Sequence, residues 1–170
     1  MNQPLVGILM GSDSDLPIME EVASALSQLQ IAFEISICSA HRSPEKSAQY
    51  AKSAEERGIK VLIAGAGAAA HLAGALAAHT LLPVIGIPLS SSPLHGLDAL
   101  LSTAQMPAGV PVATMALDRA GARNAAILAA QILALRDPRL AARLRGLKKK
   151  MAEEIDEKDR QMKKKKGKGA

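Results

Sequence analysis

The stretch LVGILMGSDSDLPIMEEVASALSQL, residues 5–29, decides the fold. It opens with a short continuous apolar run, typical of a strand that is buried on both faces of a parallel sheet. After a polar turn at 11–15, with Pro17 near the first helical turn, apolar side chains recur at helical spacing. These side chains are Leu16, Met19, Val22, Ala23, Leu26 and Leu29. A buried strand that leads directly into an amphipathic helix begins a βαβ unit.

The following hundred or so residues repeat this alternation. We expect further strands at 31–38, 60–64, 83–87 and 110–115, and helices at 44–57, up to about 78, at 120–135 and from 138 onward. Right-handed βαβ units of this kind place helices on both faces of a parallel sheet. The first two strands resemble a wound pair. The sequence therefore predicts a flavodoxin-like three-layer α/β/α sandwich, with a five-stranded parallel sheet of order 2-1-3-4-5 and an extended C-terminal helix.

The charge of the chain is divided unevenly between its two parts. Residues 1–135 carry 7 Lys and Arg against 10 Asp and Glu, whereas residues 136–170 carry 14 against 6. We expect a catalytic α/β domain over 1–135, a C-terminal helix over 136–160 and a basic, frayed tail over 161–170. The helix has an apolar stripe that a neighbouring subunit would cover. Its members are Leu140, Leu144, Leu147, Met151 and Ile155.

Composition argues against several classes of protein. The single cysteine, Cys38, excludes a disulfide framework and a multi-cysteine zinc site, and the four histidines lack metal-ligand spacing, so no metal is expected. Phe33 and Tyr50 are the only aromatic residues, which disfavours an RNA-stacking surface. Basicity confined to the tail predicts no nucleic-acid partner, although a weak polyanion contact of the tail stays open. Without a leader-like or membrane-length apolar segment, we expect a cytoplasmic protein with no membrane contact.

Candidate binding residues follow the first two strands. Ligands of open α/β sheets sit outside the carboxyl ends of the strands. Ser12 and Ser14 stand before a helix start and suit a phosphate, while Asp15 suits ribose hydroxyls; the alternative is that Ser14 or Asp15 only caps the helix. Arg42 could bind phosphate in a bidentate manner, and the adjacent His41 could exchange protons near neutral pH.

The third strand is followed by small residues. The segment 65–72 would let backbone N–H groups approach a ligand closely, with tight helix packing as the alternative for Ala69 and Ala70. It is neither a P-loop nor a dinucleotide fingerprint. The residues alone thus predict a site for a phosphate-containing small molecule, with His41 as its proton carrier.

Four motifs together carry a resemblance to a known family. They are GSDSD (11–15), SAHRSP (39–44), AGAGAAAHL (64–72) and QMPAGVPV (105–112). Over residues 5–135 the chain resembles the N5-carboxyaminoimidazole ribonucleotide (N5-CAIR) mutases of purine biosynthesis. The resemblance implies a homo-octamer with sites at subunit junctions, and conversion of N5-CAIR to its ring-carboxylated isomer CAIR without metal or cofactor. It further implies decarboxylation to the aminoimidazole ribonucleotide (AIR) and CO2, then recarboxylation at ring carbon 4.

The resemblance also implies residue roles. His41 would be the general acid/base and His71 a supporting histidine. Substrate-binding roles fall to three groups: phosphate contacts, a ribose contact, and contacts to the carboxylate or CO2, which include the backbone of 66–69. The implied binding residues are Ser12, Ser14 and Arg42 (phosphate), Asp15 (ribose), Ser39, Gly67 and Ala68 (carboxylate), and Leu72.

The chain departs from the family pattern in places. Ala68 and Ala73 stand where glycine and proline are common, and residues 113–118 differ from the usual Gly-Thr-Leu-Ala-Ile-Gly. A methyl group at position 68 would narrow the CO2 pocket if φ there is positive. A degenerate, regulatory family member that binds nucleotide is therefore an alternative, against which intact His41 and Arg42 argue.

Two other readings are less favoured by the residues. A sister class that carboxylates AIR directly has His-Lys after Ser-Ala and lacks the Gly-Ala-Gly run, whereas this chain has Arg42 and the run 65–67. A receiver-type signalling domain would need acidic residues at the end of the first strand and a lysine after the fifth. Gly11, Ser12 and Asp118 stand there instead.

Overall fold

Five apolar runs form one parallel sheet in the computed structural model, which describes residues 3–166. The strand order is β2-β1-β3-β4-β5, so the predicted order 2-1-3-4-5 is confirmed. β1 lies between β2 and β3, with Ile8 opposite both Ile35 and Ile63. The strands are β1 (Val6–Met10), β2 (Phe33–Ile37), β3 (Val61–Gly67), β4 (Val84–Leu89) and β5 (Ala113–Thr114).

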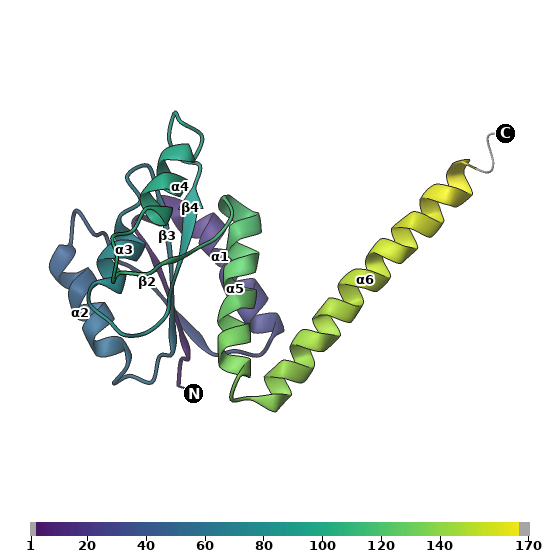
Figure 1. Ribbon diagram of the computed structural model, residues 1–170, viewed down its shortest axis with the longest axis horizontal. Coiled ribbons are helices and arrows are strands. Elements are labelled where there is room, and N and C mark those ends of the chain that lie inside the picture. The colour runs from purple at the N-terminus through teal and green to yellow at the C-terminus, as the bar shows by residue number, and fades with distance from the viewer. Residues whose placement is uncertain (1–2, 167–170) are drawn as a thin grey trace.

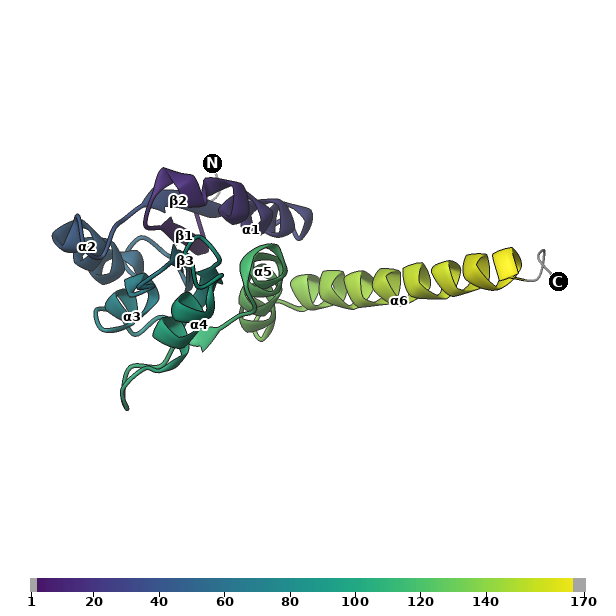
Figure 2. The same ribbon diagram turned by 90° about the horizontal axis from the view of Figure 1, so that it is seen from above.

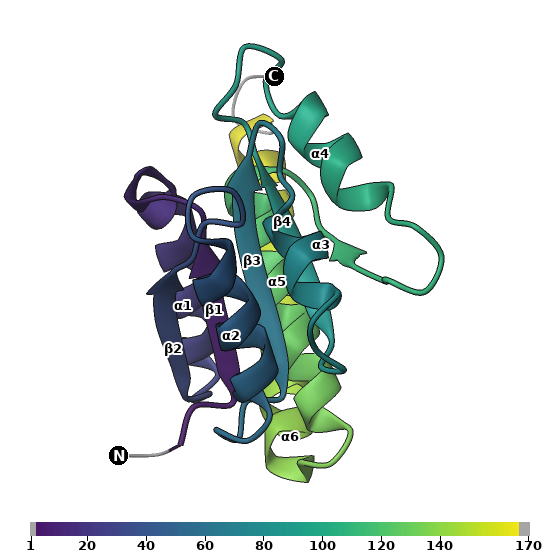
Figure 3. The same cartoon turned by 90° about the vertical axis from the view of Figure 1, so that its left-hand side faces the viewer.

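Helices cover both faces of the sheet and complete the flavodoxin-like three-layer sandwich (Figures 1 and 3). Figure 2, seen from above, shows α1 and α5 on one side of the strands and α2 and α3 on the other. A short 3₁₀ turn, η1, lies between β1 and α1. The bounds are η1 (Asp13–Asp15), α1 (Leu16–Gln28), α2 (Pro44–Ala54), α3 (Leu72–Ala77), α4 (Leu97–Ala104), α5 (Asp118–Ala134) and α6 (Pro138–Lys166).

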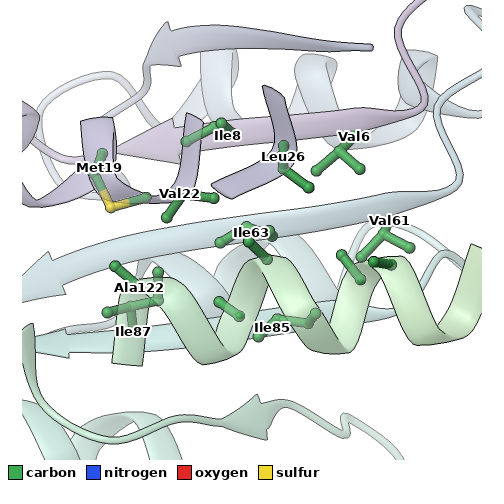
Figure 4. Close-up of a cluster of buried hydrophobic side chains, with 14 of the residues drawn as sticks. Val6, Ile8, Met19, Val22, Leu26, Val61, Ile63, Ile85, Ile87 and Ala122 are labelled. Atoms are coloured by element: carbon green, nitrogen blue, oxygen red, sulfur yellow. The ribbon is translucent and has the colours of Figure 1, made fainter. Parts of the chain in front are cut away.

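The larger core lies between the sheet and the α1/α5 layer. Alternate residues of the central strands, among them Val6, Ile8 and Ile63, meet Met19, Val22 and Leu26 of α1 (Figure 4). The face that α5 turns to this core is almost entirely alanine, which allows the helix to lie close to the strands. Its buried alanines are Ala122, Ala125, Ala126, Ala129 and Ala130.

A polar cluster ties the edge strand β2 to the segment after α2. The Tyr50 hydroxyl donates a hydrogen bond of 2.6 Å to Glu34 Oε1, and Arg57 forms an ion pair with the same carboxylate. Burial and the Glu34 carboxylate raise the pKa of Tyr50, so the phenol stays a donor. Gly7 of β1 makes room for this tyrosine, because a Cβ there would lie 2.5 Å from the Tyr50 oxygen.

Several expected boundaries were wrong. Helix α4 was not expected at all, and β5 spans two residues rather than 110–115, because Pro111 has no N–H to donate to a neighbouring strand. β3 continues to Gly67, three residues beyond the expected end of the strand at 64. Helix α6 runs past residue 160 to Lys166, so the tail expected to fray from 161 is helical that far; 167–170 lie outside the described residues.

Helix α6 projects away from the α/β sandwich, and most of its length extends beyond it (Figures 1 and 2). Leu140 is buried, and Leu144 and Leu147 pack against the larger core. Beyond them the same stripe continues with Met151, Ile155 and Met162, which are 52%, 63% and 50% exposed. Within the described part of the chain, no helix is both long and apolar enough to cross a membrane.

Candidate active site

The loops after β1, β2 and β3 meet at the carboxyl edge of the sheet, as parallel strands require. Arg42, in the loop after β2, reaches across to the loop after β1. Its Nη2 donates a hydrogen bond of 2.9 Å to the carbonyl oxygen of Gly11. The guanidinium therefore lies against the loop after β1, at the residue that precedes Ser12.

The loop after β1 is held by reciprocal hydrogen bonds. The Ser14 N–H donates to Ser12 Oγ at 3.4 Å, and the Ser12 N–H donates to Asp15 Oδ2 at 3.2 Å. The Asp15 side chain thus completes the capping box of η1, whereas at the N-cap of α1 it makes no side-chain capping hydrogen bond. Burial raises the pKa of Asp15, an effect that the backbone hydrogen bonds from Ser12 and Gly11 oppose. The hydroxyl of Ser14 is exposed at the same edge.

The loop after β2 is equally well ordered by its own side chains. The Arg42 N–H donates to Ser39 Oγ at 3.1 Å, and the Ser39 N–H donates to Ser43 Oγ at 3.1 Å. Ser43 occupies the N-cap of α2, as expected, but its side chain makes no capping hydrogen bond and turns back to Ser39 instead. The turn presents the side chains of His41 and Arg42 to solvent.

Two histidines from different loops form a pair. His41 Nε2 lies 2.8 Å from Nδ1 of His71, which immediately precedes α3. The rings are nearly perpendicular, with an interplanar angle of 81° and centroids 5.0 Å apart. Because a neutral imidazole has one N–H and one lone pair, one ring donates to the other along this axis. Such a pair can hold or pass a proton while keeping the His41 ring in one orientation.

The backbone between β3 and α3 adopts a left-handed conformation at Ala68, with φ of 51°. The carbonyls of Ala68 and Ala69 accept hydrogen bonds from the N–H groups of Ala70 and His71, at 2.9 and 2.7 Å. This tight double turn brings His71 to His41. Position 68 has the positive φ at which a methyl group was expected to narrow the pocket, and Ala68 is exposed.

A cavity of about 560 Å³ adjoins the first loop, lined by Ser14 and Asp15 on one side and by Ser90, Ser91 and Asp118 on the other. Sequence reasoning assigned none of the last three to the site. The only signal was that Ser90 and Ser91 directly follow β4 at the same edge. Asp118 begins α5 and approaches them only through the fold.

The structure brings together the residues that sequence reasoning assigned to the first two loops, and it joins His41 to His71. Gly67 ends β3 beside them. Leu72 instead lies in the core, 2% exposed, so in the single chain it supports α3 rather than facing solvent. Among residues 3–166 no three His, Cys, Asp or Glu side chains are grouped as metal ligands would be.

The fold and the loops define an α/β protein with a candidate site at the carboxyl edge of a parallel sheet. A family model described as "AIR carboxylase" matches residues 5–154. The N5-carboxyaminoimidazole ribonucleotide mutase of Pyrococcus horikoshii is 54% identical over 160 residues, which cover 94% of this chain and 89% of that protein. The mutase of Bacillus subtilis is 56% identical over 142 residues, 84% and 88% of the two chains.

Solved structures agree with these relatives. The crystal structure of Treponema denticola PurE superposes with a TM-score of 0.85 at 34% identity, covering 94% of this chain and 99% of that one. The chain belongs to the AIR carboxylase family.

Proposed function

We propose that this protein is an N5-CAIR mutase of de novo purine biosynthesis, an isomerase that converts N5-CAIR to CAIR. The observation that carries the proposal is the His41–His71 pair, with 2.8 Å between ring nitrogens, in which His41 belongs to the same loop as Arg42. The names of relatives more than 50% identical over most of the chain support the same activity.

Substrate binding is assigned to the first two loops. Ser12, Ser14 and Arg42 would hold the phosphate, since hydroxyl and guanidinium donors suit its oxygens. Asp15, whose carboxylate also accepts the Ser12 N–H, would accept from ribose hydroxyls. This assignment places the base of the nucleotide toward the histidine pair.

The reaction requires one proton, which the protein supplies and then takes back. The bond between the exocyclic nitrogen and the carboxylate carbon breaks, its electron pair stays on nitrogen, and His41 supplies the proton that nitrogen takes up. This step leaves AIR and CO2 in the pocket. Carbon 4 then attacks CO2, and the proton displaced from carbon 4 returns to His41, so the enzyme ends in its starting state. His71 would hold the His41 ring in position.

Ser39, Gly67, Ala68 and the small residues that follow would hold the carboxylate and the transient CO2. Fixed backbone donors stabilise the charge that develops as the carboxylate forms again. No cofactor or metal is assigned to these steps. Leu72 would serve the pocket indirectly, by fixing the start of α3 beside His71.

Water exclusion argues for an oligomer. His41, Arg42, Ala68 and His71 are all exposed in the single chain, whereas trapped CO2 requires a closed pocket. We therefore assign the cover to neighbouring copies in a homo-oligomer, an octamer by the family resemblance, with the part of α6 beyond Leu147 packed on a neighbouring subunit.

An assay with purified protein tests the activity. N5-CAIR is supplied without ATP or metal and with a chelator, and CAIR formation is followed; AIR plus bicarbonate is run in parallel. Rapid conversion of N5-CAIR supports the proposal. Turnover of AIR and CO2 alone would instead place the protein with direct AIR carboxylases, and binding of AIR without any turnover would favour a regulatory role.

A further inference from the structure

The loop after β4 is tied to the start of α5 by one carboxylate. The Ser90 N–H donates to Asp118 Oδ1 at 2.9 Å, and the Ser90 hydroxyl donates to Asp118 Oδ2 at 2.5 Å. Asp118 thus fixes both the backbone and the side chain of Ser90. Because α4 and β5 lie between the two residues in the sequence, this contact joins two segments that are far apart along the chain.

Asp118 makes this contact from an unfavourable backbone conformation. Its φ is 53°, in the left-handed region that favours glycine. Asp adopts this region more readily than most other residues, but still at a cost in energy. Glycine would satisfy the backbone but could not bind Ser90. The side chain makes two charge-assisted hydrogen bonds in spite of this backbone strain. We infer that the role of Asp118 is to make this contact with Ser90.

The fixed loop carries Ser91 to the carboxyl edge of the sheet. A Cβ at Gly67 would overlap Ser91 Oγ, so this hydroxyl lies against the end of β3. On the other side, a Cβ at Gly96 would come within 3.2 Å of Ser90 Cα, so the loop is held there too. Among the described residues Ser91 Oγ has no hydrogen-bond partner, and Ser91 lines the cavity with Ser14 and Asp15.

We propose that Asp118 is a positioning residue: it clamps Ser90 and thereby holds the Ser91 hydroxyl against Gly67, as a donor to the bound ribonucleotide. This inference rests on the proposed function, because it assigns a role within that substrate pocket. It extends the site to a loop and a helix start that the four sequence motifs do not include.

Three variants test the clamp. Asp118→Gly removes both hydrogen bonds while suiting the positive φ, so folding is preserved. Asp118→Asn keeps one acceptor oxygen and should restore part of the loss. Ser91→Ala removes the positioned hydroxyl alone. Gln30→Gly is the matched control, since Gln30 also has a positive φ of 56° but lies in the turn between α1 and β2.

Hydrogen exchange gives a readout that does not depend on catalysis. In Asp118→Gly, amides of residues 89–97 should exchange on the order of tenfold faster, because the Ser90 N–H loses its acceptor. Exchange elsewhere, and exchange of this loop in Gln30→Gly, should match the wild type. Unchanged exchange of the loop in Asp118→Gly would overturn the clamp.

Kinetics then test what the clamp is for. Asp118→Gly and Ser91→Ala should each lower kcat/KM for N5-CAIR on the order of tenfold, and the double variant should be no worse than either, since both changes remove one interaction. Faster loop exchange with wild-type kcat/KM, or losses that multiply in the double variant, would refute the positioning role. An inactive wild-type enzyme would contradict the proposed function and not the clamp. In that case, loss of AIR affinity in both variants would still support the clamp.

Discussion

His41 lies in an exposed turn, where a side chain would ordinarily sample several rotamers. The bond to His71 changes this, because a 2.8 Å contact between ring nitrogens leaves the imidazole one preferred orientation. The partner comes from a different loop, so the orientation depends on the sheet that joins them. A proton carrier needs this fixed geometry to reach the atom that it protonates.

His41→Asn should remove turnover while leaving the nucleotide bound. Asparagine can keep a hydrogen bond to His71 but cannot carry a proton, so kcat for N5-CAIR should fall by roughly 10²–10⁴-fold. Steady-state kinetics and calorimetric titration with AIR measure the two properties. His79→Asn, in the turn after α3, is the control and should behave as wild type. Full activity of His41→Asn would exclude His41 as the proton carrier.

Ala68→Gly should improve both stability and catalysis. The left-handed φ of 51° disfavours alanine by about 1–2 kcal/mol. Glycine's greater freedom in the unfolded chain offsets about 0.5–1 kcal/mol of the gain. We expect an increase of roughly 0.5–1 kcal/mol in the free energy of unfolding by urea titration, together with a higher kcat/KM.

Gln30→Gly serves as the kinetic control for this change too: it relieves a similar positive φ, loses the hydrogen bond from Arg143, and should leave the kinetics unaltered. A lower kcat/KM in Ala68→Gly would mean that the methyl group helps to shape the carboxylate pocket.

Among the elements, β2 is an edge strand and depends on its polar anchor. Burial alone would raise the pKa of Glu34, but the hydrogen bonds from Tyr50 and Arg57 lower it below its ordinary 4.5. A lowered pKa means that the folded state favours the carboxylate. This contribution to stability is present above pH 4.5 and is lost as the pH falls through the folded-state pKa.

Glu34→Gln should therefore destabilise the protein at neutral pH and not in acid. We expect a loss of about 1 kcal/mol at pH 7, since the cluster is partly exposed and solvent screens it. Urea titrations of both proteins at pH 7 and at pH 4, at one protein concentration, measure the gap. The gap should narrow at the lower pH, and kcat/KM should not change; a gap independent of pH would contradict the role of the charge.

The sequence was a good guide to elements whose pattern is decided locally. The run 5–10 and the helical spacing after it predicted β1 and α1. Strand–helix alternation predicted the parallel sheet, and the interpretation of the first two strands as a wound pair predicted its order. It was a poor guide where tertiary contacts decide. Helix α4 is short, lacks a side-chain cap and follows the left-handed Gly96, so its start resembles a loop.

The same distinction applies to the site. His41, Arg42 and the serines stand in recognisable motifs directly after strands, and the rule that parallel strands end at one edge brings them together. Asp118 could not be found this way, because its partner Ser90 lies far along the chain and no local pattern encodes the contact. Its positive φ is likewise a consequence of the fold.

At the scale of the whole molecule, α6 is the helix whose apolar stripe stays partly exposed in a single chain. Replacing Met151, Ile155 and Met162 with serine should weaken assembly on the order of a hundredfold or more in dissociation constant. Full burial of an apolar side chain of this size contributes about 1.5–3 kcal/mol, and assembly would bury only the exposed half of each. Light scattering over a dilution series measures the mass. Far-ultraviolet circular dichroism should show the body still folded.

The control replaces Glu153, Asp156 and Arg160, which lie on the opposite side of α6 at 3.6 residues per turn, with serine. It should keep the wild-type mass. Equal dissociation of both variants would mean that helix stability, rather than the apolar stripe, matters. A wild-type protein that is monomeric at micromolar concentration would contradict the assignment of α6 to a neighbouring subunit.

The alanine face of α5 has a consequence for which substitutions the protein can accept. Alanine has no side-chain rotamers to lose, so the five buried alanines of this helix pack on the sheet without side-chain entropy loss. At Ala125 or Ala126, leucine or isoleucine would overfill the interface, at about 1–3 kcal/mol or more, whereas serine or glycine would nearly fit. Tolerance along α5 should therefore follow side-chain volume and not hydrophobicity, the reverse of the order usual in a protein core.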